Sequence, residues 1–129
     1  MHFLDTSALV KLVYQESESK ALAKFVGTDS FAISALSRTE LRRVAVRLDA
    51  ADVPRCDALL DSCFQVALTT DVLDRAGLLE PSTLRSLDAI QLACAKLLGA
   101  DLDTFVAYDQ RLIEAATVAG LTVSHPGAP

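Results

Sequence analysis

Residues 2–13 read HFLDTSALVKLV, and this stretch decides the class of fold. The short apolar run at residues 2–4 is typical of a strand, and Asp5 ends it. Thr6 and Ser7 are residue types favoured at helix N-caps, so a helix is expected to start here. Apolar side chains then follow at helical spacing: Leu9, Leu12 and Val13. A strand that passes directly into a helix is the first half of an α/β unit.

The rest of the chain repeats this alternation. Further short apolar runs predict strands at residues 31–33, 65–68, 104–107 and 121–124. Helical patterns lie between them, with apolar faces over residues 22–26, 41–48, 54–63, 72–79, 87–98 and 112–119. Mostly paired helices between successive strands predict a parallel sheet covered on both faces. The fold class is therefore α/β, a three-layer α/β/α sandwich with a short parallel sheet, and residues 1–129 form a single domain.

The composition excludes several classes of protein. Apolar residues make up 51% of the 129 residues, too many for a disordered chain. No stretch approaches the roughly 18–20 apolar residues of a membrane span, and no basic segment suggests a signal peptide, so we expect a cytoplasmic protein that does not enter a membrane. The three cysteines are odd in number and form no C-x-x-C pair, which favours reduced thiols.

The net charge of −5 is not typical of a nucleic-acid-binding protein, which usually carries a basic face. The negative charge is nevertheless compatible with nucleic-acid binding if the carboxylates gather at one place. Such a cluster binds divalent metal ions, and the ion reverses the field that a phosphate group meets. The acidic composition therefore leaves a metal-dependent nuclease open.

Two aspartates occupy equivalent positions in the predicted sheet. Asp5 follows the first apolar run, and Asp109 follows the run at residues 105–108. In a parallel sheet both would project from the carboxyl edge of the strands, where ligands of α/β proteins bind. The alternative for either residue alone is an ordinary helix N-cap.

Two further acids are expected near the same edge. Glu40 lies in the first turn of the helix after the second strand, although Ser37 and Glu40 also fit a capping box. Asp88 begins the sixth helix among apolar residues, where an unpaired carboxylate is costly; its alternative is a partly exposed first-turn acid. Converging carboxylates would repel one another without a cation, whereas carboxylate-held Mg²⁺ or Mn²⁺ activates water for phosphodiester cleavage.

Four segments resemble the motifs of PIN-domain proteins, in particular the VapC-type toxins of bacterial toxin–antitoxin pairs. They are residues 3–11 (FLDTSALVK), 34–41 (SALSRTEL), 84–93 (LRSLDAIQLA) and 105–112 (FVAYDQRL), in order and at similar spacing. One departure is Ala107, where many relatives carry Thr or Ser, so a hydroxyl that could orient water or metal near Asp109 is missing.

The resemblance implies a function and a set of site residues. It implies a PIN-like domain that cleaves RNA with Mg²⁺ or Mn²⁺, is inhibited by a cognate antitoxin protein and forms a homodimer. It assigns the catalytic and metal-binding roles to four acids: Asp5, Glu40, Asp88 and Asp109.

Other residues are candidates for RNA or partner contact. Arg42, Arg43 and Arg47 could form a basic stripe that tracks phosphates, or a solvated face that docks an acidic partner. Thr6 could supply a hydroxyl near Asp5, although capping is the alternative for both Thr6 and Ser7.

Two other functions are consistent with parts of the sequence. A catalytically idle PIN-like module that binds RNA or protein would fit the Ala107 departure. A receiver-like domain with Asp5 as phospho-acceptor would need a late lysine and a second acidic pair near the first strand, and neither is present.

Overall fold

The five strands form one parallel sheet in the order β3-β2-β1-β4-β5. The computed structural model describes all residues from 1 to 129. The elements in chain order are β1 (His2–Leu4), α1 (Thr6–Val13), α2 (Ser19–Val26), β2 (Phe31–Ser34), α3 (Leu36–Leu48), η1 (Ala50–Asp52), α4 (Val53–Asp61), β3 (Phe64–Val66), α5 (Thr70–Gly77), α6 (Ser86–Lys96), η2 (Gly99–Asp101), β4 (Thr104–Val106), α7 (Gln110–Val118) and β5 (Val123–Ser124).

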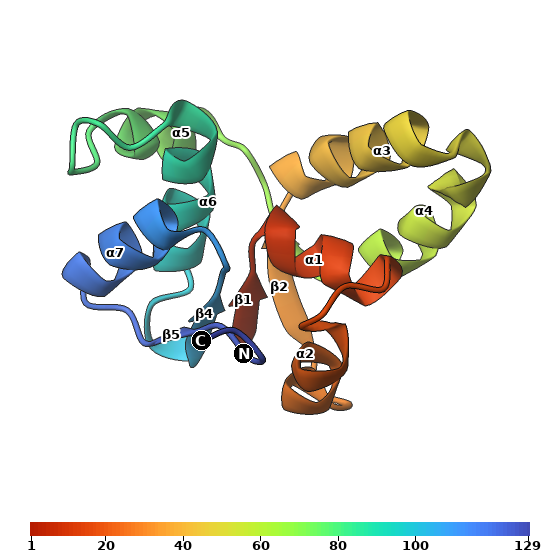
Figure 1. Ribbon diagram of the computed structural model, residues 1–129. Helices are drawn as coiled ribbons and strands as arrows, with labels where there is room; N and C mark the ends of the chain where they lie inside the picture. Colours follow the sequence, from red (N-terminus) through yellow and green to blue (C-terminus); the bar gives the residue numbers. More distant parts are fainter.

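Alternating side chains of the strands divide the interior into two cores. Phe3 and Phe105 face the core formed with α5, α6 and α7, where their rings stack with centroids 5.7 Å apart. Leu4 and Val106 face the core formed with α1, α2, α3 and α4. The sheet therefore lies between two layers of helices, which stand on opposite sides of it in Figure 1. The predicted three-layer α/β/α sandwich is confirmed.

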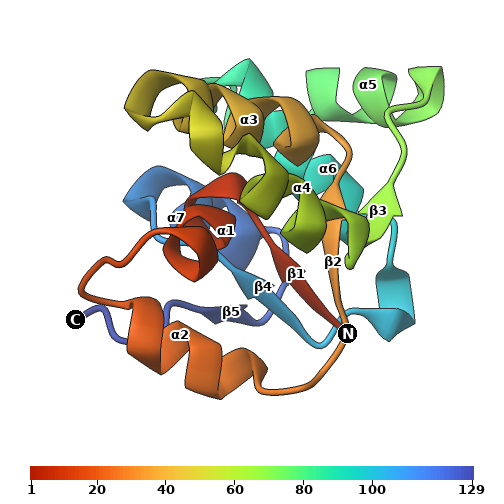
Figure 2. The same ribbon diagram turned by 90° about the vertical axis from the view of Figure 1, so that its right-hand side faces the viewer.

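The order of the strands creates a topological switch point at one edge of the sheet. From β1 the chain moves outward through β2 to β3, then returns to place β4 on the other side of β1. The direction of winding thus reverses between β1 and β4, which lie side by side in Figure 2. Ligands of such sheets bind beyond the carboxyl ends of the strands at this switch point. Asp5 follows β1 at that place.

The start of helix α3 differs from the predicted elements. Helix α3 begins already at Leu36, before the apolar pattern at residues 41–48, because the Ser34 hydroxyl accepts a hydrogen bond from the Leu36 N–H at 3.1 Å and starts the helix directly after β2. Helix α7 alone connects β4 to β5, as the single helical pattern at residues 112–119 predicts. All three cysteines are free thiols. None of the helices has the length and apolar character needed to cross a membrane.

Candidate active site

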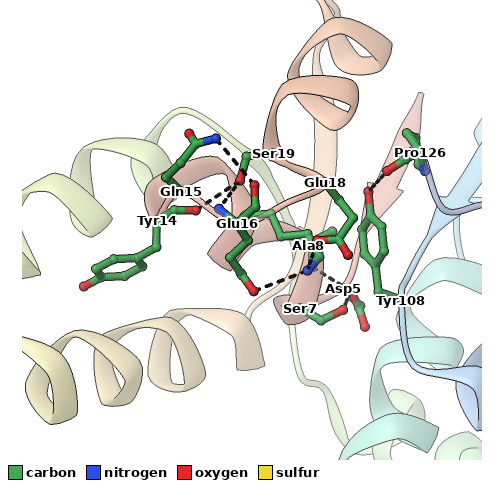
Figure 3. A network of polar contacts seen from close by, with 11 residues as sticks. Asp5, Ser7, Ala8, Tyr14, Gln15, Glu16, Glu18, Ser19, Tyr108 and Pro126 are labelled. Carbon is green, nitrogen blue, oxygen red and sulfur yellow. Dashed lines mark hydrogen bonds and ion pairs between the residues drawn. The ribbon is translucent and has the colours of Figure 1, made fainter. Parts of the chain in front are cut away.

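Asp5 caps the first helix and lies close to two other predicted site acids. Its Oδ1 accepts hydrogen bonds from the Ala8 N–H at 3.0 Å and the Ser7 hydroxyl at 2.7 Å, which caps α1 (Figure 3). The residue is only 5% exposed. Burial above all, and the charges of Asp88 and Glu40 to a smaller extent, raise the pKa of its carboxyl to about 6, although those two hydrogen bonds lower it. Asp5 therefore lies near two other predicted acids.

Glu40 is held by hydrogen bonds from two other elements. The Thr6 hydroxyl donates to its Oε1 at 2.6 Å, and the side-chain amide of Gln91 donates to the same oxygen at 3.1 Å. The capping-box interpretation of Ser37 and Glu40 is wrong, because α3 begins before Ser37 and the Ser37 hydroxyl contacts Thr6 and Gln91. The capping alternative for Thr6 and Ser7 is wrong as well, since Asp5 caps α1 and both hydroxyls turn to the acids.

Asp88 and Asp109 share one cation. The Arg85 guanidinium lies 3.4 Å from Asp88 Oδ2 and 4.0 Å from Asp109 Oδ2. The other carboxylate oxygen of Asp109 accepts from the Leu112 N–H at 3.1 Å and caps α7. Asp109 is more exposed than Asp88, at 43% against 22% of the side chain. Asp109 is thus an N-cap that is more exposed than Asp5 and Asp88.

The four carboxylates surround one edge of the sheet without meeting at a point. The charges of Glu40 and Asp88 raise the pKa of Asp5, whereas Asp109 is linked to Asp88 through the Arg85 guanidinium. No three His, Cys, Asp or Glu side chains of the chain stand close enough to hold one metal ion between them. A shared four-carboxylate metal site therefore stays a prediction. Ala107 is fully buried in the core with α5, α6 and α7.

A second group of polar residues lies next to Asp5. Lys11 forms ion pairs with Glu18 at 3.1 Å and Glu16 at 3.5 Å, and its ammonium lies 4.6 Å from the centre of the Tyr108 ring. The Tyr108 hydroxyl donates to the Pro126 carbonyl at 2.8 Å (Figure 3). Burial raises the pKa of Tyr108 to about 12, helped by the charges of Glu18 and Asp5. Lys11 is therefore the one cation of this group and is shared by two carboxylates.

An open groove adjoins the site on the side of α6 and α7. It has a volume of about 760 Å³, and Asp88, Arg85 and Arg111 are among the residues that line it. The groove gives solvent access to Asp88. Its lining holds two cationic side chains, Arg85 and Arg111, and three acidic ones, Glu80, Asp88 and Glu114, so it carries no excess of positive charge.

The predicted basic stripe is divided by its ion pairs. Arg42 binds Asp57 of α4 through two hydrogen bonds, of 2.7 and 2.6 Å, so it serves to join α3 to α4. Arg43 and Arg47 are exposed and form no ion pair. Only these two residues of the stripe remain available for a phosphate group.

Three residues of the site were missed in the sequence: Ser37, Arg85 and Gln91. The signal for Gln91 was its spacing, because residues three apart on a helix lie on the same side and Asp88 is three residues earlier. Arg85 carried no signal, since a charged residue before a helix is ordinarily solvated.

Fold and site together define a three-layer α/β domain with acids at its switch point. Comparisons with known proteins identify the class further. The sequence model of the PIN domain matches residues 2–118. The chain belongs to the PIN-domain family, as the resemblance of its four segments implied.

The relatives that match over nearly the whole chain are named as ribonucleases. Ribonuclease VapC47 of Mycobacterium tuberculosis is 39% identical over 99% of this chain and 98% of its own length. Ribonuclease VapC46 of the same species is 41% identical over 96% of both chains. Among solved structures, a toxin–antitoxin complex from Klebsiella pneumoniae has a TM-score of 0.75 at 24% identity, with 98% of both chains covered. The M. tuberculosis toxin VapC20, described as cleaving the sarcin-ricin loop, has a TM-score of 0.77 at 15% identity over 98% of this chain and 100% of its own. These two structures share the fold.

The raised pKa of Asp5 has a consequence for folding. The folded protein binds the Asp5 proton more tightly than the unfolded chain, in which the carboxyl has a pKa of 3.8. The stability that this proton contributes is complete below pH 3.8 and is lost as the pH rises through about 6. Asn keeps the shape and the capping oxygen. We therefore expect Asp5→Asn to raise the free energy of unfolding by about 1–3 kcal/mol at neutral pH and by little at about pH 4.

Denaturant unfolding in the presence of a chelator at both pH values measures this effect. Asp49→Asn is the matched control, because Asp49 is an exposed N-cap that accepts from the Ala51 N–H at 3.0 Å. It should show no gain at either pH. An Asp5→Asn protein that is less stable than wild type at neutral pH would leave Asp5 as an ordinary cap.

Proposed function

We propose that this chain is a metal-dependent endoribonuclease and the toxin of a toxin–antitoxin pair. The observation that carries the proposal is Asp5, a buried acid at the switch point whose pKa is raised by burial and by two neighbouring carboxylates. A cation beside such a carboxyl stabilises its ionised form. The curated relatives, which match along the whole chain, carry the name ribonuclease.

The residues at this edge suit a divalent ion in kind and in charge. Carboxylate oxygens are the ligands that Mg²⁺ and Mn²⁺ prefer, and Asp5, Glu40 and Asp88 carry them, with Asp109 as the outer acid. These side chains do not stand close enough to share one ion as they lie, so binding would have to draw their carboxylates together. When bound, such an ion would activate water and neutralise charge on the phosphate. Thr6 and Gln91 would hold the Glu40 carboxylate in a fixed orientation through their hydrogen bonds. Arg85 lies where it can contact a phosphate group in the groove beside Asp88.

The chain would act on RNA in the cytoplasm together with two kinds of protein partner. A cognate antitoxin is supported by the solved structures that share this fold, one of which is a toxin–antitoxin complex. A second copy of the chain would form a homodimer, which stays a prediction. Exposed apolar residues available for such contacts include Val46 and Leu48 of α3 and Leu78 after α5.

Cleavage of RNA by the purified protein tests the proposal. Asp5→Asn should lower kcat by orders of magnitude although it stabilises the fold, and EDTA should abolish cleavage until Mn²⁺ or Mg²⁺ is restored. Asp49→Asn, the exposed cap, should cleave as wild type does. Cleavage that survives in EDTA contradicts the metal-dependent mechanism. A folded wild type that cuts no RNA with either ion favours the binding module.

The arginines of α3 predict a second, separable effect on RNA binding. Arg43→Gln and Arg47→Gln should each weaken binding of single-stranded RNA and reduce the slope of log K against log salt by about 0.7, the share of one phosphate contact. Arg42→Gln should leave the slope unchanged and lower stability, since it breaks the bond to Asp57. Filter binding with catalytically inactive Asp5→Asn protein at several salt concentrations measures the slopes. Equal slopes for all variants would show that α3 does not contact RNA.

The acids also predict how the antitoxin inhibits. An arginine of the antitoxin could bind the carboxylates through two parallel hydrogen bonds, as guanidinium groups bind carboxylates elsewhere. Asp5→Asn and Glu40→Gln should then weaken the complex about 30-fold or more. Titration calorimetry with the purified antitoxin measures the affinity, with Asp49→Asn as control. Unchanged affinity in both site variants would place the antitoxin elsewhere.

A further inference from the structure

Gln91 joins three elements of the fold through one side-chain nitrogen. It lies on α6 and is only 3% exposed. Its Nε2 stands 3.1 Å from each of three oxygens, which belong to Thr6 of α1 and to Ser37 and Glu40 of α3. Helix α6 belongs to one layer of the sandwich and α1 and α3 to the other. The amide therefore bridges the two helical layers at the carboxyl edge of the sheet.

The hydrogen-bond donors of this cluster point toward Glu40, either directly or through Thr6. The Thr6 hydroxyl gives its proton to Glu40 Oε1 at 2.6 Å, a charge-assisted bond. The Ser37 hydroxyl, 2.9 Å from Thr6, then donates to Thr6 and accepts from the amide. The nitrogen of Gln91 must face this group, because its oxygen would otherwise oppose the Glu40 carboxylate. Both of these hydrogen bonds to Glu40 end on Oε1, and Oε2 accepts none.

The arrangement has a cost that packing does not explain. The Gln91 Oε1 atom is buried without any hydrogen-bond partner. A buried polar atom in this state lowers stability, and an apolar side chain of the same size would avoid the loss. The benefit of glutamine at this position is therefore the donor that it directs at Glu40.

We propose that Gln91 is a positioning residue, which holds the Glu40 carboxylate in place through its side-chain amide while Thr6 and Ser37 complete the contact. This inference rests on the proposed ribonuclease function, in which Glu40 is one of the site acids. Gln91 acts through Glu40 and needs no contact with RNA. A purely structural role would instead make Gln91 a packing residue whose effects are independent of Glu40.

The first experiment measures the contact in the metal-free protein. Melting temperatures are compared for wild type, Gln91→Met, Glu40→Gln and the double variant in chelator. If Gln91 contacts Glu40, the loss of melting temperature in the double variant should differ from the sum of the two single losses by about 3 °C or more. Gln91→Glu should melt lower than Gln91→Met, since it places a second carboxylate against Glu40. The reversed pair, Gln91→Glu with Glu40→Gln, should regain melting temperature. Additive losses throughout overturn the inference.

The second experiment measures the effect on the site. Gln91→Met should lower kcat and the affinity for Mn²⁺, the latter measured by titration calorimetry, each about 10–100-fold, with little change in KM for RNA. The matched control is Gln65→Met, because Gln65 is half-buried and donates to the Leu60 carbonyl at 3.0 Å away from the site. It should keep wild-type kcat and Mn²⁺ affinity.

The two experiments separate this inference from the proposed function. A folded Gln91→Met protein with wild-type kcat and wild-type Mn²⁺ affinity overturns the role of Gln91. Absence of RNA cleavage in wild type and in Gln65→Met alike overturns the proposed function, while the coupling of melting temperatures still decides whether Gln91 holds Glu40.

Discussion

The position of Asp5 is the constraint on which the site depends. Its main-chain N–H donates to the Val106 carbonyl at 3.1 Å and ties the end of β1 to β4, while its carboxyl caps α1. The residue is therefore fixed to the sheet on one side and to a helix on the other. Burial raises its pKa to about 6, so this placement lowers the stability of the ionised protein. Residues kept for function at the expense of stability are common in active sites.

The sheet brings acids together from both layers of helices. Glu40 comes from α3 in one layer and Asp88 from α6 in the other. The two helices meet at the carboxyl edge, where Gln91 of α6 reaches Ser37 and Glu40 of α3. Stacked Phe3 and Phe105 lie in the floor beneath, in adjacent strands. The site thus depends on the relative placement of the two layers, which the central strands fix.

Much of the fold and part of the site could be predicted from the sequence. The strand positions and the places of Asp5 and Asp109 follow from alternation and from strand ends, which are local properties. Helix starts placed Glu40 and Asp88 near the same edge, and the resemblance joined the four acids into one site. The contacts among Thr6, Ser37 and Gln91 depend on how two helices are rotated against each other, and the bond between Arg42 and Asp57 depends on how α3 meets α4. Neither rotation is encoded in a local pattern.

The two halves of the acidic edge differ in their electrostatic balance. Asp88 and Asp109 already share a counter-ion in Arg85. Glu40 receives hydrogen bonds only from uncharged groups, the Thr6 hydroxyl and the Gln91 amide. A neutral donor orients a carboxylate and leaves its full negative charge in place, which a lysine or arginine at the same position would cancel. The side of the edge that holds Glu40 therefore keeps an unbalanced negative charge, whereas Asp88 and Asp109 on the other side already have a cation beside them.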